Sequence, residues 1–458
     1  MNVAWTFLWY VIAVGFLVIV HEYGHFWVAR RLGFKVLRFS IGFGKPIWRR
    51  VVGNDGTELV IAPIPMGGYV KMLDERDGPV PPEFLARSFT RKPPWQRILV
   101  LLAGPGFNVL FAILALWGMR WVSGINDIKP IVGEVQQASV AARSGMSRGD
   151  EILAINDKPI PDSRDVMFDL LDTILGQGQA RVAVRSTNGQ VHTLVLAVPD
   201  RAARRQLTEP AMLMSGLGFQ FQEPPRPPVL GEVVRGGNAE HAGLRPGDRI
   251  VAIGATSISD WADVSRIVSV AAGTTITVQY QRGAERHTAQ VLVIATPDGT
   301  GHMVGRIGIG STTGGKLPPG MRVHKDLSVG AALISACDDA WSLTATQSKL
   351  LGRMVLGEVS VKNLSGPLSI AQFAGESAQA GPASFLEFLV LISLAIALFN
   401  LLPIPLLDGG QIVFQAAEWI KGRPVSERTQ IFGQQIGIAL LVLLLGVALF
   451  NDVSRQFG

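Results

Sequence analysis

Four long stretches without a charged residue constrain this chain more than any other feature of its sequence. They run over residues 2–20, 98–119, 388–407 and 431–451. An α-helix needs about 20 apolar residues to cross the hydrocarbon core of a bilayer, and each stretch is close to that length. The sequence therefore predicts a polytopic α-helical membrane protein with four transmembrane helices, near residues 4–28, 97–120, 384–404 and 431–451.

The first stretch could instead be a cleaved signal peptide. Such a peptide has basic residues before its apolar run and a small-residue cleavage site after it. No Lys or Arg precedes the stretch here, and it ends in the sequence His21-Glu22-Tyr23-Gly24-His25. We therefore interpret it as a membrane span.

The distribution of basic residues predicts the orientation of the spans. The loop from Arg30 to Arg97 holds thirteen Lys and Arg residues against six acidic ones. Because basic residues collect in cytoplasmic loops, this loop should be cytoplasmic, and both termini and the long segment after the second span should lie outside. The formal net charge of +6 then reflects membrane topology, and we expect no nucleic-acid partner. The lone Cys337 excludes an internal disulfide.

The segment between the second and third spans repeats itself. Gly133-Glu134-Val135 recurs as Gly231-Glu232-Val233, and the Gly149-Asp150 pair recurs as Gly247-Asp248, always 98 residues later. This predicts two copies of one domain, over residues 126–223 and 224–322, joined by a stiff linker at 224–228. The shared pattern resembles α+β PDZ domains of bacterial proteases, which bind peptide C-termini by adding them to a sheet edge. The alternative is that the Gly-Asp pairs have only a structural role, as turns of the chain.

Residues 323–383 are predicted to hold an amphipathic helix and a linker. Residues 327–355 combine apolar residues at helical spacing with a few charged ones, which is typical of a helix on the membrane surface. Packing of this helix against the second repeat is the alternative.

The candidate chemistry begins with His21-Glu22-Tyr23-Gly24-His25, which matches the pattern H-E-x-x-H. Residues four apart share one face of a helix, so both imidazoles can bind one ion. Two neutral imidazoles suit Zn²⁺, which needs a third protein ligand and an open position in a catalytic site. Glu22 can then take a proton from water. Ionisable groups are costly inside a span, which favours a site over two buried core histidines.

The third ligand is predicted to be Asp408. It follows Pro403 and Pro405, which must break the third span because proline lacks a donor N–H. Broken backbone at membrane depth is tolerated where it lines a wet cavity. The alternative is that Asp408 caps the helix that follows it.

Together these motifs resemble the site-2 protease family of intramembrane metalloproteases. The resemblance rests on H-E-x-x-H in a first span, N-x-x-P-x-P-x-x-D-G over residues 400–409, and the two PDZ-like domains between the second and third spans. It implies a bacterial inner-membrane enzyme with one Zn²⁺ per chain, bound by His21, His25 and Asp408, and Glu22 as the general base. The repeats and both termini would be periplasmic. Asn400 would be a second catalytic residue that steadies the oxyanion, or it could only satisfy carbonyl groups of the broken helix.

The resemblance also implies a membrane-associated β-hairpin within residues 40–75, formed by residues 57–73. Its edge would hold the substrate in extended form. The candidate substrate-binding residues are Gly67, Gly68, Tyr69 and Val70. An ordinary cytosolic hairpin is the alternative. A second motif of the family, Gly104-Pro105-Gly106-Phe107-Asn108, can be explained by small-residue packing alone.

The expected function is hydrolysis of a peptide bond within the transmembrane segment of a single-span protein, after a first cut on its outer side. By the same resemblance the substrate is an anti-sigma factor of the sigma-E envelope-stress response, with remnant signal peptides as a second class. One rival is a metal or ion transporter, but the four spans show no internal repeat. Another is an idle PDZ receptor, which would have no use for the intact H-E-x-x-H.

Overall fold

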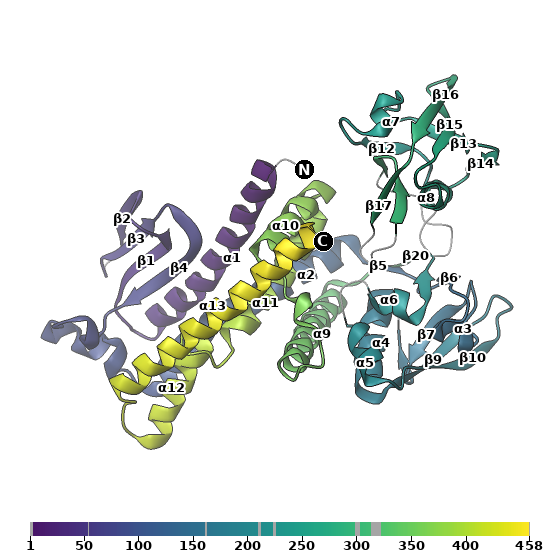
Figure 1. The fold of residues 1–458 in the computed structure, drawn as a ribbon. Helices are drawn as coiled ribbons and strands as arrows, with labels where there is room; N and C mark the ends of the chain where they lie inside the picture. Colours follow the sequence, from purple (N-terminus) through teal and green to yellow (C-terminus); the bar gives the residue numbers. More distant parts are fainter. Residues whose placement is uncertain are drawn as a thin grey trace. The chain divides into compact units, whose positions relative to one another are not determined.

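The chain forms two compact units in a computed structural model. The model describes residues 3–53, 55–160, 163–208, 212–222, 226–297, 303–312 and 322–457. One unit comprises Met1–Ile125, Ala202–Met212 and His324–Phe457, and the other comprises Asn126–Arg201 and Leu213–Val323 (Figure 1). Pro224 and Pro225 of the predicted linker lie outside the described residues.

Long apolar helices dominate the first unit. They are α1 (Val3–Arg31), α2 (Pro94–Ser123), α11 (Pro382–Asn400) and α13 (Glu427–Phe457). Within the described residues, these four helices are long and apolar enough to cross a membrane. The four predicted spans thus correspond to four candidate membrane-spanning helices, and the third helix ends at Asn400, not near residue 404.

Helix α2 is the centre of this unit. It packs against α1, α11, α12 (Asp408–Lys421) and α9 (Val329–Val355). The small side chains Ala336 and Ala340 of α9 are buried with Ala112 of α2, and Arg120 of α2 forms an ion pair of 2.8 Å with Asp339 of α9. The predicted amphipathic helix is thus present, and its small-residue face is buried against a span.

A further helix occupies the region predicted as a linker. Helix α10 (Pro367–Ala380) packs against α1, α11 and α13. Asp452 of α13 accepts hydrogen bonds from the backbone N–H groups of Gly366, Leu368 and Ser369 at the N-terminus of α10. The carboxylate therefore caps α10 from another helix, a contact that no local sequence pattern announces.

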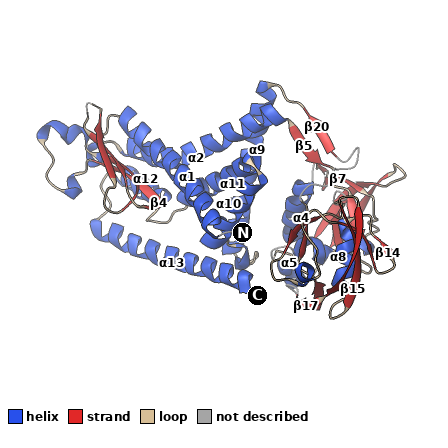
Figure 2. Cartoon of the chain, turned by 90° about the horizontal axis from the view of Figure 1, so that it is seen from above, coloured by secondary structure: helices blue, strands red, loops and turns tan. Residues whose placement is uncertain are grey.

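The predicted membrane-associated hairpin of residues 57–73 is wrong in its pairing. Strands β1 (Val36–Phe43), β2 (Trp48–Val52), β3 (Thr57–Ile61) and β4 (Ile64–Met72) form one sheet in the order β2-β3-β1-β4. Strand β3 pairs with β1 in parallel and β4 pairs with β1 antiparallel. Two-residue hairpin loops favour positive φ, and Pro63 between β3 and β4 cannot adopt it. The sheet lies beside α1 (Figure 2), with β4 as one of its edges.

The second unit contains the predicted repeat. Strand β6 (Val132–Val135), helix α3 (Val140–Arg143), strand β7 (Glu151–Ile155), strand β8 (Lys158–Pro159) and helix α4 (Ser163–Gln177) form the first copy's opening half. Their counterparts are β12 (Leu230–Val233), α7 (Asn238–His241), β13 (Arg249–Ile253), β14 (Thr256–Ser257) and α8 (Trp261–Val270). Every counterpart begins 98 residues later.

Each copy continues into an antiparallel sheet of the same strand order. The first sheet is β10-β9-β7-β8, with β9 (Gln179–Arg185) and β10 (Val191–Ala197), and the second is β14-β13-β15-β16, with β15 (Thr275–Arg282) and β16 (Glu285–Leu292). In both copies the aspartate of the Gly-Asp pair is buried and accepts a backbone N–H three residues earlier, at 2.9 Å for Asp150 and 2.8 Å for Asp248. The turn role of these pairs is thus real in both copies.

One segment of the predicted first domain belongs elsewhere. Residues Ala202–Met212 cluster with the first unit, where the carbonyl oxygen of Thr208 accepts a hydrogen bond of 2.6 Å from Asn363. The remaining elements of the chain are short. The helices are α5 (Arg201–Gln206) and α6 (Met212–Leu217), with 3₁₀ turns at Glu75–Asp77, Pro82–Arg87, Phe89–Arg91 and Val361–Asn363. The strands are β5 (Ile125–Ile128), β11 (Phe219–Phe221), β17 (Ile294–Pro297), β18 (Met303–Arg306), β19 (Ile309–Ser311) and β20 (Arg322–Lys325).

Candidate metal centre

The two histidines of H-E-x-x-H lie on the buried face of α1. His21 and His25 are each only 8% exposed, and their imidazole centroids lie 4.9 Å apart. Two glycines allow α2 to cross α1 closely at this point. A Cβ atom on Gly24 would meet the backbone of Ala103, and one on Gly104 would overlap the imidazole of His25. The absence of a side chain at Gly104 therefore leaves the space that the two imidazole rings occupy.

Asp408 reaches the histidines from the break after the third span. Helix α11 ends at Asn400 and α12 begins at Asp408, and the prolines lie in the connection. This connection folds tightly over the first turn of α12, where a Cβ atom on Gly409 or Gly410 would collide with the backbone of Leu401 or Ile404. Asp408 makes no side-chain cap to α12, whose N-cap is Leu407. The alternative role as a helix cap is therefore absent from the structure.

Three potential ligand atoms converge on one point. Nε2 of His21 lies 3.2 Å from Nε2 of His25 and 3.2 Å from Oδ2 of Asp408, and Nε2 of His25 lies 3.4 Å from the same oxygen. Two atoms bound tetrahedrally to zinc at about 2.0–2.1 Å are about 3.3–3.4 Å apart. The three separations thus fit one face of a zinc tetrahedron. Oδ2 of Asp408 is buried and accepts no well-oriented hydrogen bond, as expected of an atom that serves a cation.

Glu22 brings a second carboxylate to the same place. Its side chain is partly buried on α1, and its Cγ atom lies 3.0 Å from the position of a Cβ atom on Gly68 of strand β4. With neutral imidazoles, Glu22 and Asp408 carry two negative charges in apolar surroundings. Buried charges need compensation, and a divalent cation would supply it.

The other predicted site residues, Asn400 and the glycines and tyrosine of β4, make contacts outside the triangle of potential ligand atoms. Asn400, at the end of α11, donates a hydrogen bond of 3.0 Å to the carbonyl oxygen of Ile396, which is the structural role left open by the sequence. Gly67 and Gly68 lie where β4 touches its neighbours, since a Cβ atom on Gly67 would overlap the ring of Phe43. The hydroxyl of Tyr69 accepts a hydrogen bond of 3.2 Å from Arg38 of β1.

The sequence motif that ends at Asn108 of α2 was explained by packing alone, and the contact of Asn108 with His21 was missed. The side chain of Asn108 is completely buried, and its Nδ2 atom lies 3.4 Å from Nδ1 of His21. Its backbone carbonyl accepts a hydrogen bond of 2.9 Å from the hydroxyl of Ser393 in α11. An amide in the middle of an apolar span was the available signal, because such a group is costly there without a partner.

Similarity to known proteins extends over nearly the whole chain. The model of Peptidase family M50 matches residues 9–444. The chain belongs to peptidase family M50. It is 39% identical to the regulator of sigma-E protease RseP of Escherichia coli (strain K12) over 98% of this chain and 99% of the relative. It is 37% identical to a zinc metalloprotease of Neisseria meningitidis over 99% of this chain and all of the relative.

Membership of family M50 makes the chain a metalloprotease. Its RseP-like relatives along nearly the full length assign it to regulated intramembrane proteolysis in the inner membrane. Zinc appears in the names of the relatives from Neisseria meningitidis and Vibrio cholerae. Among solved structures, the PDZ domain of an SdrC-like protein from Listeria monocytogenes matches at 19% identity. That match covers 20% of this chain and 92% of the domain, with a TM-score of 0.17.

Proposed function

We propose that this M50 peptidase binds one zinc ion through His21, His25 and Asp408, and cuts a peptide bond inside the transmembrane segment of a single-span protein. The observation that carries the proposal is the triangle of three ligand atoms, separated by 3.2–3.4 Å, with Glu22 on the same helix as two of them. The ligands come from α1 and from the break after α11, two elements at membrane depth. Bound zinc would supply Lewis-acid polarisation of the attacking water and of the substrate carbonyl.

Glu22 performs the proton transfers in this proposal. Its carboxylate takes a proton from water as the water oxygen attacks the scissile carbonyl carbon, and returns the proton to the amide nitrogen as the C–N bond breaks. The Asn400 amide can use its second N–H to stabilise the oxyanion, because its bond to Ile396 occupies only one. The packing of His21 and His25 against α2 keeps both imidazole rings in the orientation that the metal requires.

Substrate presentation is assigned to the exposed edge of β4. Strand β4 pairs only with β1 among the described strands, and Gly68 lies beside Glu22. A substrate helix hides its amide groups in its own hydrogen bonds, so a strand edge that draws it into extended form makes the scissile bond accessible. Gly68 of β4 allows its close approach to α1, because a Cβ atom there would meet side-chain atoms of Val18 and Glu22.

The finer physiological assignments rest on topology and on the named relatives. The basic loop between α1 and α2 should be cytoplasmic, and both termini and the repeats periplasmic. The two copies are proposed to be PDZ domains that bind peptide C-termini and exclude substrates with intact outer domains. An anti-sigma factor fits this arrangement, as the relatives named as sigma-E regulators indicate, and remnant signal peptides are a second class.

One assay tests the hydrolytic proposal against its rivals. Detergent-purified protein is incubated with a model transmembrane segment, with and without 1,10-phenanthroline, and its zinc content is measured. We expect one zinc per chain and a cut within the segment that the chelator abolishes. Metal without cleavage would favour a transporter, and peptide binding without metal would favour an idle receptor.

A deletion tests the proposed role of the repeats. Removal of residues 126–201 and 213–322, which keeps the segment 202–212 that clusters with the first unit, should leave cleavage of a trimmed substrate intact and allow cleavage of an untrimmed one. An unchanged preference for the trimmed substrate would contradict the filter and leave the hydrolytic assignment standing.

A further inference from the structure

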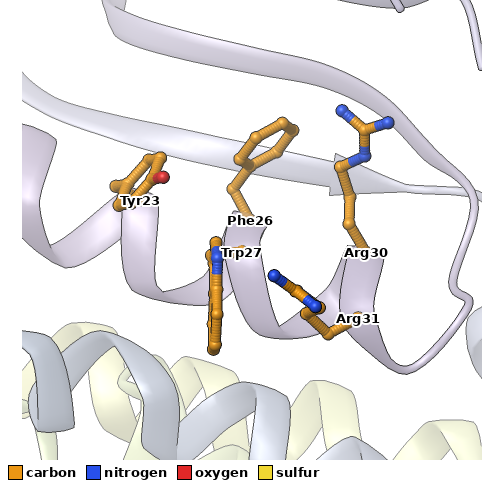
Figure 3. A pocket seen from close by; sticks show the side chains of 5 residues that line it. All are labelled: Tyr23, Phe26, Trp27, Arg30 and Arg31. Carbon is orange, nitrogen blue, oxygen red and sulfur yellow. The ribbon is translucent and has the colours of Figure 1, made fainter.

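A groove lined by aromatic and basic side chains runs along the end of α1 that faces the basic loop. Its volume is about 400 Å³, and its lining residues are Tyr23, Phe26, Trp27, Arg30 and Arg31. Their spacing places all five on one face of the helix over two turns. In Figure 3 the three rings occupy one end of the row and the two guanidinium groups the other.

The rings are held in place by the elements on either side of α1. The ring of Phe26 packs edge-on against Phe39 of β1, with centroids 5.4 Å apart. On the other side, Tyr23 and Trp27 contact Phe107 of α2 at 5.9 Å and 6.0 Å. Tyr23 and Trp27 nevertheless remain 44% and 41% exposed, so the aromatic rings of the groove are held in place but remain accessible to a ligand.

Neither arginine of the groove forms an ion pair with a described carboxylate. The pKa of Asp55 is lowered first by its hydrogen-bonded ion pair with Arg87, and to a smaller extent by the charge of Arg30. The guanidinium of Arg31 lies 5.1 Å from the ring centroid of Trp27, and that of Arg30 lies 5.5 Å from the ring of Phe26. Both arginine side chains are exposed. Basic residues at a helix C-terminus interact favourably with the helix dipole. That interaction does not require the rings of Tyr23, Phe26 and Trp27 beside them.

The position along the span indicates what fills the groove. The candidate membrane span of α1 ends at Arg31, so a bilayer crossed by α1 would have the arginines at headgroup level and the rings deeper, towards the acyl chains. Tyr and Trp collect at this depth, and basic pockets on the cytoplasmic side of spans bind anionic headgroups. We propose that the groove binds one anionic phospholipid, with its phosphodiester on Arg30 and Arg31 and an acyl chain along Tyr23, Phe26 and Trp27.

This site is separate from the hydrolytic chemistry and does not depend on it. The lipid would hold the end of α1 against β1 and α2, the two elements that its floor residues already contact. Charge complementarity selects an anionic headgroup over a zwitterionic one, because two guanidinium groups line the groove and no carboxylate is among its lining residues.

The test measures lipid retained by the full-length protein. The protein is reconstituted in nanodiscs of phosphatidylglycerol and phosphatidylcholine, extracted into detergent, washed, and analysed by native mass spectrometry. We expect one phosphatidylglycerol to remain bound in preference to phosphatidylcholine. Each interfacial arginine contributes about 1 kcal/mol near an anionic surface, so the double variant Arg30→Gln, Arg31→Gln should retain this lipid about 30-fold more weakly.

A matched variant separates the groove from general surface charge. Lys45→Gln, Arg50→Gln removes two exposed charges from the same loop and should retain the lipid like the wild type. Equal loss in both double variants, or equal retention of the two lipids by the wild type, would overturn the proposal. Displacement of the lipid by soluble glycerol phosphate at equal concentration would assign the site to a free phosphate ester instead. Trp27→Leu should weaken lipid binding without changing the preference for anionic headgroups.

Discussion

The side-chain amide of Asn108 lies 3.4 Å from Nδ1 of His21. His25 has an equivalent contact, because its Nδ1 atom lies 2.7 Å from the carbonyl oxygen of Val100. Both contacting residues belong to α2, so one helix orients both imidazoles from behind while their Nε2 atoms face Asp408. Such partners fix the ring orientation and the tautomer of a metal-binding histidine.

Asn108→Leu should weaken metal binding. A histidine that binds a metal through Nε2 carries its proton on Nδ1, so Asn108 must offer its oxygen there, and Oδ1 currently has no hydrogen-bond partner. A half-turn of the amide provides this acceptor. Loss of a partner of this kind typically costs about 10–100-fold in metal affinity, measurable by chelator competition. Asn108→Asp keeps an acceptor and should retain most of the affinity, whereas equal losses in the two variants would indicate a packing role only.

Alanine at any of the three proposed ligands should remove both the metal and the activity. His21→Ala, His25→Ala and Asp408→Ala each leave two protein ligands, too few for a stable catalytic zinc site. Zinc content is measured by elemental analysis and cleavage with a model transmembrane segment. Insertion of each variant in the membrane is the control. Normal zinc in Asp408→Ala would remove Asp408 from the ligand set.

Glu22→Gln should keep the metal and lose nearly all turnover. Glutamine has almost the same shape but cannot take a proton from water, and general base catalysis contributes about 10²–10⁴-fold. Zinc content and single-turnover cleavage are measured on the same preparation. Activity above about a tenth of wild type would rule out the assigned role, since it lies outside that range.

The parts of this fold that the sequence predicted are those encoded locally. Span length, the i, i+4 spacing of His21 and His25, and the repeat offset of 98 residues are each readable from one segment. The missed parts depend on contacts between distant segments. Nothing near residue 370 announces α10, whose N-terminus is capped by Asp452, and nothing in residues 57–73 shows that β1 lies between β3 and β4.

The residues of the candidate site also fall into a group that sequence motifs predicted and a group that only the structure revealed. Its proposed ligands stand in recognisable motifs, so three distant residues could be assembled from pattern alone. Asn108 and Gly104 act only through the close crossing of α1 and α2. Their importance therefore became visible only with the packing of the two helices.

The second repeat should lose stability in acid through Asp248. Burial opposes ionisation of this carboxylate, but hydrogen bonds from Arg282 and from the N–H of Arg245 outweigh it and hold its pKa below the usual 3.8. A lowered folded-state pKa gives stability that is complete above the unfolded value and is lost as pH falls through the folded one. The loss should therefore appear below about pH 4.

The variant Asp248→Asn isolates this effect. It should lower the free energy of unfolding at neutral pH by about 1.5–3 kcal/mol, the contribution of a hydrogen bond to a charged group, and flatten the acid dependence. Hydrogen exchange of strand β13 reports the local stability. Asp150→Asn is the matched control, because Asp150 makes the equivalent N–H contact and has no described arginine partner. An acid slope unchanged by Asp248→Asn would assign the loss to other groups.

The last prediction concerns the edge of β4 that should receive the substrate. The N–H of Leu73 donates to the carbonyl oxygen of Lys35, at 2.9 Å, and so points towards β1. N–H groups alternate in direction along a strand, so the N–H of Tyr69 also points to β1, and those of Gly68 and Val70 point to the exposed edge. Val70→Pro should therefore remove a donor that only a substrate uses, and slow cleavage of a helix-prone segment strongly. Val70→Ala keeps the donor and should have a much smaller effect.

Two comparisons keep this prediction distinct from misfolding of the sheet. Tyr69→Pro removes a rung between β4 and β1 and should lower thermal stability. Val70→Pro should keep its zinc and be about as stable as Val70→Ala, because both variants lose the same side-chain packing against the cluster around Phe34 and Val36. A substrate with Gly or Pro near the cut is already partly unwound and needs less help, so Val70→Pro should spare its cleavage. Equal loss on helix-prone and helix-broken substrates would mean that β4 supports the site without pairing. Full activity of Val70→Pro on a helix-prone segment would exclude pairing at this residue, because the missing N–H leaves no donor to replace it.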